Sequence, residues 1–66
     1  MEKAIKFMED EIQTADKMFS FWVKRTYECR DIGEEENAEM YNRWATEALN
    51  KKITISVLLD KLKELA

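Results

Sequence analysis

The chain has 66 residues, 14 of them acidic and 11 basic, which gives a formal net charge of −3 and room for one domain over residues 1–66. One cysteine and no histidine exclude an internal disulfide, a Ser-His-Asp triad and the commonest transition-metal ligand. A single glycine excludes phosphate-binding glycine loops, and the acid excess disfavours non-specific binding to nucleic acid.

Two stripes of mainly apolar residues flank the only glycine, Gly33, at alternating steps of three and four, the spacing of an amphipathic helix. The first stripe comprises Ile5, Met8, Ile12, Ala15, Phe19, Trp22, Thr26 and Cys29. The second comprises Ala38, Tyr41, Ala45, Ala48, Lys52, Ile55, Leu59 and Leu62. Each residue of the first stripe has a partner in the second whose number brings the sum to 67. We therefore predict an all-α fold, an antiparallel hairpin of helices over residues 2–30 and 34–65.

The charges favour the same topology. Residues 1–16 carry −3, residues 17–33 carry +2, residues 34–48 carry −4 and residues 49–66 carry +2. An antiparallel hairpin places the first block beside the fourth and the second beside the third, and both pairings are attractive. Exposed ion pairs contribute only about 0–1 kcal/mol each, so the blocks select the register more than they stabilise it.

The turn between the helices is expected over residues 31–34. Asp31 is predicted to cap the second helix, with Glu34 three residues later in the spacing of a capping box. The only charged residue on either stripe is Lys52, opposite Ala15, and its long stem is expected to carry the ammonium group out to water. Cys29 lies on the first stripe and is expected to be a buried, structural thiol.

The second helix has one ambiguous segment, residues 50–56. Its β-branched residues disfavour a helix, and Thr54 could cap a separate third helix. Against a break, the stripe stays in phase through the segment. We therefore expect a continuous helix, kinked or broken at most near residues 50–55.

Each helix carries more apolar residues than a hairpin contact needs. The extra residues all fall on one face of the hairpin, here called the apolar face: Phe7, Met18, Phe21, Met40, Trp44, Leu58 and Leu65. A contiguous exposed apolar patch marks an interface. We therefore expect a homodimeric four-helix bundle or a protein partner docked on this face, with Phe21 and Trp44 as energetic anchors.

Charged clusters supply the remaining candidates. An acidic surface of Glu34, Glu35, Glu36 and Glu39 could meet a partner. The cations Lys17, Lys24, Arg25 and Arg30 could bind nucleic acid, which is the main alternative to a protein-interaction module.

Acidic residues three positions apart could hold Mg²⁺ for nucleotide hydrolysis, and two such pairs are Glu36 with Glu39 and Glu28 with Asp31. With 14 acids in 66 residues, however, such pairs are expected by chance, and helix capping explains them.

Taken together, the sequence predicts a small non-catalytic interaction or regulatory module of the adaptor or inhibitor type. No cofactor and no metal are expected. The unpaired cysteine, and the absence of a signal-like or membrane-spanning apolar run, predict a cytoplasmic protein.

Overall fold

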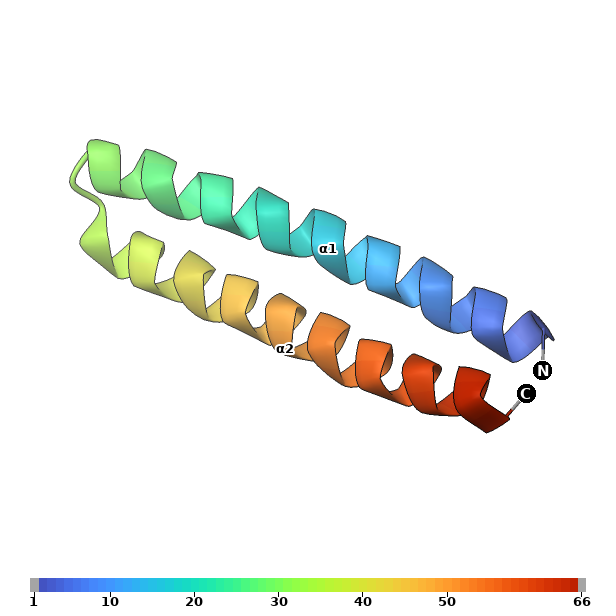
Figure 1. The fold of residues 1–66 in the computed structure, drawn as a ribbon. Coiled ribbons are helices and arrows are strands. Elements are labelled where there is room, and N and C mark those ends of the chain that lie inside the picture. The colour runs from blue at the N-terminus through green and yellow to red at the C-terminus, as the bar shows by residue number, and fades with distance from the viewer. Residues whose placement is uncertain (1, 66) are drawn as a thin grey trace.

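The computed structural model describes residues 2–65, which form two long α-helices joined by a tight turn (Figure 1). Helix α1 spans Glu2–Asp31 and helix α2 spans Glu35–Leu65. The helices lie antiparallel, with both ends of the chain at one end of the rod and the turn at the other (Figure 1). The predicted hairpin is confirmed, and its helix boundaries fall within one residue of those expected.

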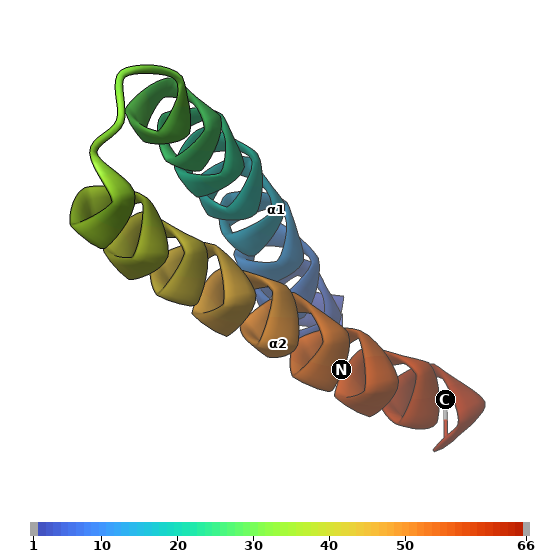
Figure 2. The same cartoon turned by 90° about the vertical axis from the view of Figure 1, so that its left-hand side faces the viewer.

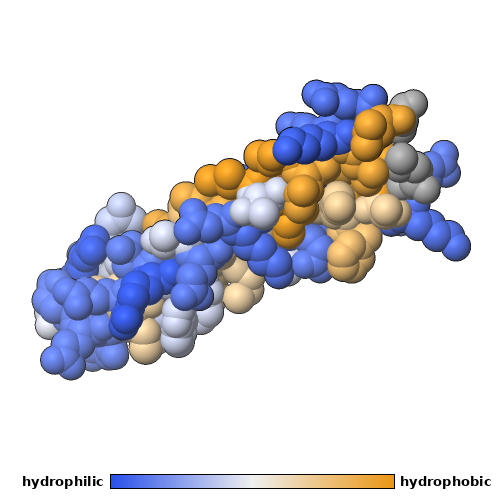
Figure 3. Space-filling model, turned by 90° about the horizontal axis from the view of Figure 1, so that it is seen from below, coloured by the Kyte–Doolittle hydropathy of each residue, from blue (hydrophilic) through white to orange (hydrophobic). Residues whose placement is uncertain are grey.

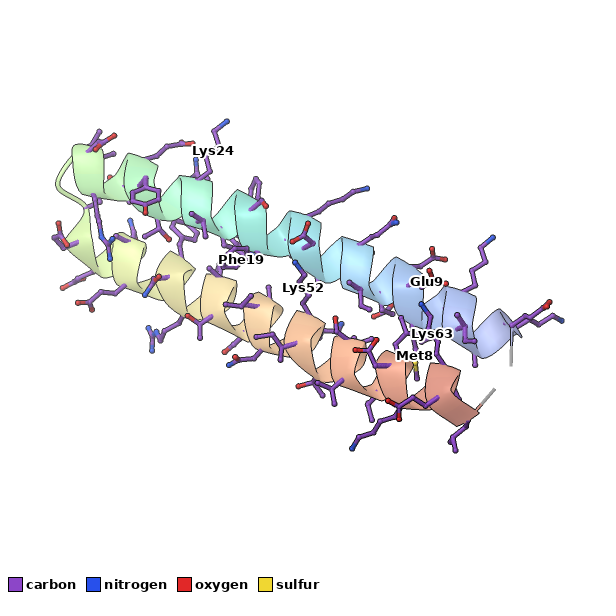
Figure 4. The ribbon with its side chains drawn as sticks, in the orientation of Figure 1. Met8, Glu9, Phe19, Lys24, Lys52 and Lys63 are labelled. Atoms are coloured by element: carbon purple, nitrogen blue, oxygen red, sulfur yellow. The ribbon has the colours of Figure 1, made fainter. Side chains whose placement is uncertain are left out.

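The contact between the helices follows the two predicted stripes. All six buried residues of residues 2–65 lie on them: Ala15, Thr26, Cys29, Ala38, Ala45 and Leu59. The other ten stripe positions are half-buried. Phe19, Met8 and Lys52 lie between the helices in Figure 4. The spacing of apolar residues thus determined which side of each helix faces its neighbour.

Cross-helix contacts give the register. Trp22 contacts Trp44, and their residue numbers sum to 66. Lys52 Nζ lies 2.8 Å from Asp16 Oδ1, and these residue numbers sum to 68. Both sums are within one of the predicted value of 67. Lys52 therefore reaches the edge of the contact, where its side chain is 36% exposed, as expected for a snorkelling lysine. A second bridge, Lys51 Nζ to Glu11 Oε2 at 3.3 Å, joins the acidic start of α1 to the basic end of α2.

The turn corrects one prediction. Gly33, at φ +80°, donates its N–H to the Arg30 carbonyl at 3.1 Å, and Glu34 donates to the Cys29 carbonyl at 2.8 Å. These two bonds form a Schellman motif, which carries α1 through Asp31. Asp31 therefore ends the first helix, and its predicted role as a cap is wrong. Glu34 occupies the capping position of α2, because its carbonyl accepts the first helical bond from Ala38 at 3.0 Å.

Helix α2 runs through residues 50–56 without interruption, so the alternative of a third helix beginning at Thr54 is wrong. Ile55 and Leu59 both face α1 and are half-buried and buried, respectively. Helix propensities differ by only about 0.7 kcal/mol among ordinary residues, so packing of this stripe outweighs the β-branched run.

The two helices form a single layer (Figure 2). The rod measures 50 × 14 × 11 Å and has a radius of gyration of 15.0 Å, against about 11 Å expected for a compact domain of this length. Within residues 2–65, no large side chain is fully buried. Neither α1 nor α2 is long and apolar enough to cross a membrane.

Candidate interaction surface

The apolar face lies open along much of the rod. Of its seven residues, Met40 is half-buried and the other six are exposed, including Phe21 at 51% and Trp44 at 38%. Seen from below, hydrophobic surface gathers toward the end of the rod where the chain begins and ends, whereas the turn end is hydrophilic (Figure 3). The predicted residues are thus accessible, and the packing of α1 on α2 leaves them without a cover.

Four rings form an aromatic cluster on this face: Phe21, Trp22, Tyr41 and Trp44. Trp22 is its centre. Its ring stacks on Tyr41 at a centroid distance of 5.4 Å and an interplanar angle of 11°, and it meets Trp44 edge-on at 4.8 Å. Phe21 meets Trp22 edge-on at 4.8 Å, and Tyr41 meets Trp44 at 5.5 Å. The rings contact one another across α1 and α2, so the cluster forms one continuous aromatic surface.

Arg25 lies at the edge of the aromatic cluster. Its guanidinium carbon is 5.4 Å from the centre of the Tyr41 ring, within cation–π range, and its Nη1 lies 3.3 Å from Glu28 Oε2. The pKa of Arg25 is raised above its ordinary value, chiefly by its polar contact with the Tyr41 side chain and further by Glu28. The guanidinium is therefore a permanent positive charge beside the rings. Lys24, by contrast, points away from α2 (Figure 4).

Two shallow hollows lie on the apolar face, and both are lined in part by Trp22 and Trp44. The hollow nearer the turn contains the four rings with Lys24, Arg25 and Glu28. The second lies over the small side chains of Ala15 and Ala48, and its walls include Met18. The rings of Trp22 and Trp44 form a wall shared by the two hollows, and a partner's side chains could insert on either side of it.

The acidic surface lies at the turn end. Glu34, Glu35, Glu36 and Glu39 are all exposed, and Glu34 Oε2 accepts a hydrogen bond from Asn37 Nδ2 at 3.2 Å. Their place in the first turn of α2 is favourable for negative charge, because the amino end of a helix carries partial positive charge. Helix stabilisation is therefore a sufficient reason for this cluster.

The four candidate cations do not gather on one surface. Arg25 and Lys24 line the aromatic hollow, whereas Arg30 lines a groove on the opposite side of the helix contact, beside Phe19 and Val23. Lys17 is exposed on α1. Over residues 2–65 no three carboxylate or thiol groups come together to hold a metal ion.

Sequence patterns did not predict the exposure of several surface residues. Trp22 and Tyr41 were expected to be covered in the helix contact, yet both line the aromatic hollow. Their ring size was the available signal, since a contact made of alanines has no room for an indole. Other exposed apolar residues lie outside the predicted face: Tyr27, Ile32, Ile53 and Val57.

Comparison of the chain with known protein families, curated proteins and solved structures finds no match. Function is therefore inferred from the surface itself.

Proposed function

We propose that the chain is a small non-catalytic interaction module that binds protein through its apolar face and forms a homodimeric four-helix bundle. The observation that carries the proposal is the exposure of Phe21, Trp44 and Met18 around two hollows on one face. Aromatic residues next to hollows are the usual anchors of protein interfaces. The unpaired, buried Cys29 fits a reducing compartment such as the cytoplasm.

The surface area supports a second copy as the occupant. The chain exposes 5181 Å². A compact monomer of its mass, 7.9 kDa, exposes about 4,400 Å². The excess of about 800 Å² equals what one partner contributes to a standard interface. Dimerisation through the apolar face would remove this excess and give the hairpin a core.

In such a dimer the acidic surface stays outside, because the turn end of α2 projects its carboxylates around the helix end. We propose Glu34, Glu35, Glu36 and Glu39 as the surface through which the bundle meets a further, basic partner in an adaptor or inhibitor role. Clustered carboxylates attract such partners over about one Debye length, so this contact should weaken with salt.

A photoreactive benzoyl-phenylalanine in place of Phe21 tests the proposal. We expect protein adducts in cells of the source organism, either with the chain itself or with a partner. The matched control places the same residue at Tyr27, which is 61% exposed and lies outside the apolar face. Equal adduct yields at the two positions, or none at Phe21, would contradict an interface at this face.

One observation favours a second candidate, binding of single-stranded nucleic acid. Phe21 and Trp44 present rings beside Arg25 and Lys24, and stacking rings with nearby cations bind unpaired bases. On this alternative, binding of an oligonucleotide falls steeply with salt and is lost in Arg25→Glu. A module that binds only protein shows neither effect.

A further inference from the structure

We infer that the apolar face is covered by a second copy whose turn lies at the opposite end of the bundle, related by a two-fold axis that crosses both helices near their midpoints. The inference rests on the proposed function and adds the orientation of the partner. Two symmetric arrangements cover the apolar faces of two hairpins, with the turns at the same end or at opposite ends. Charges at the edges of the face distinguish them.

With the turns at the same end, α1 of one copy lies beside α2 of the other at the same heights as inside a hairpin. Facing residue numbers then again sum to about 67. Arg25 faces Arg43 in this arrangement, and Lys17 faces Lys51, with each pair summing to 68. Like charges that face each other across an interface oppose association. The two-fold axis repeats both contacts, so each of these two pairs of cations occurs twice in the dimer.

With the turns at opposite ends, each helix lies antiparallel to its own copy. An axis that passes α1 at Met18 passes α2 at Leu49, because 18 and 49 sum to 67. Facing residue numbers then sum to 36 between the two copies of α1 and to 98 between the two copies of α2. Met40 of one copy faces Leu58 of the other, so the turn end of one apolar face meets the far end of the other. The axis lies near the middle of the rod, and nearly the full length of both hairpins overlaps.

The same register pairs opposite charges. Arg25 faces Glu11 of the second copy, with numbers summing to 36, and Glu47 faces Lys51 of the second copy, with numbers summing to 98. Symmetry makes each pair twice. Two like-charge approaches remain: the two copies of Lys17, with numbers summing to 34, and Asp10 with Glu28 of the second copy, with numbers summing to 38. All three residues are exposed at the outer edge of α1, where water and salt screen the repulsion. Attractive pairs therefore outnumber repulsive ones.

These pairs extend a bridge that already exists within the hairpin. Glu11 Oε2 lies 3.3 Å from Lys51 Nζ of its own chain. In the proposed dimer Glu11 also contacts Arg25 of the second copy, and Lys51 also contacts Glu47 of the second copy. Four charges of alternating sign therefore form one network that joins the two copies. Networks of this kind contribute more than isolated exposed pairs. The charges that set the hairpin register thus also set the orientation of the dimer.

Distances between spin labels test the orientation. In a Cys29→Ala background, a nitroxide is attached at Glu35→Cys, an exposed site in the first turn of α2. Residue 35 lies 14 positions from the axis at residue 49, so its two copies are about 42 Å apart with the turns at opposite ends. With the turns at the same end they are within about 20 Å, the width of a bundle. A label at Lys17→Cys lies within about 20 Å of its copy in both arrangements and reports dimerisation alone.

A long distance from residue 35 together with a short one from residue 17 is the expected result. Short distances from both sites would overturn the orientation and leave the proposed interface intact. No dipolar signal from either site, at protein concentrations up to hundreds of micromolar, would overturn the second copy as occupant. The adduct test at Phe21 then decides separately whether the face binds another protein.

A charge exchange gives an independent readout. Glu47→Lys alone faces Lys51 of the second copy, and Lys51→Glu alone faces Glu47, so each is expected to weaken the dimer about tenfold. A mixture of the two variants restores attraction at both contacts and is expected to form the mixed dimer preferentially. If Glu47→Lys leaves dimerisation unchanged, these residues do not face each other and the proposed register is wrong.

Discussion

Trp22 is the residue on which the aromatic cluster depends, and a double-mutant cycle with Tyr41 measures its contact. The two rings stack at 5.4 Å and 11°, a geometry that contributes about 0.5–1.5 kcal/mol beyond burial of area. Truncating a fully buried tryptophan to alanine costs about 3–5 kcal/mol. Because Trp22 is half-buried and leucine keeps part of the contact, Trp22→Leu should cost about 2 kcal/mol.

We expect Tyr41→Leu to cost about 1 kcal/mol and the double variant about 2 kcal/mol, so that the coupling is about 1 kcal/mol. Loss of the contact between Arg25 and the Tyr41 ring accompanies Tyr41→Leu in both backgrounds and therefore cancels in the cycle. Urea unfolding followed by circular dichroism at one fixed protein concentration gives the four free energies. A chain of 66 residues has about 3–10 kcal/mol of stability, so the variants keep a measurable transition.

The control cycle pairs Trp22 with Tyr27, which lines the groove on the other side of the helix contact. Those two substitutions should add within about 0.5 kcal/mol. Additivity within the same limit between Trp22 and Tyr41 would refute the stacked arrangement of these two rings.

Four further substitutions, one of them a control, test the fold by the same unfolding assay. Leu59→Ala, at a side chain only 6% exposed, should cost about 2–3 kcal/mol, whereas Val57→Ala at 49% exposure should cost less than about 1 kcal/mol; equal losses would place Leu59 outside the contact. Gly33→Ala should cost about 1–2 kcal/mol purely through its positive φ, since space around it is open, and an unchanged stability would contradict the Schellman turn. Asp16→Asn should cost less than about 1 kcal/mol, and the loss should shrink in 1 M salt if the bridge to Lys52 is its cause.

The hairpin could be predicted because one simple pattern carries it. Steps of three and four on both sides of Gly33 specify two helices, and every buried residue between Glu2 and Leu65 lies on the predicted stripes. The ambiguity near Thr54 came from local propensity. Tertiary packing overrode it, because Ile55 and Leu59 gain more by facing α1 than the segment loses by being helical.

The details of the turn and of the surface could not be predicted in the same way. Four acids lie within the segment from Asp31 to Glu36, and only the hydrogen bonds around Gly33 decide which of them ends α1 and which begins α2. Trp22 was placed correctly on its stripe, but its ring extends past the stripe to the aromatic cluster. Side-chain direction at the edge of a contact depends on rotamers and neighbours, which a helical wheel does not contain.

Small residues lie buried in the helix contact, and a large ring extends past its edge. Ala15, Ala38 and Ala45 are buried in the contact, and the Trp22 indole beside them extends past it to the aromatic hollow, whereas the Phe19 ring stays between the helices (Figure 4). A single layer of two helices has no second layer to cover the aromatic cluster (Figure 2). The apolar face therefore stays uncovered in a single hairpin. In the proposed dimer, covering that face stabilises the hairpin by mass action, so the stability of the fold should rise with protein concentration.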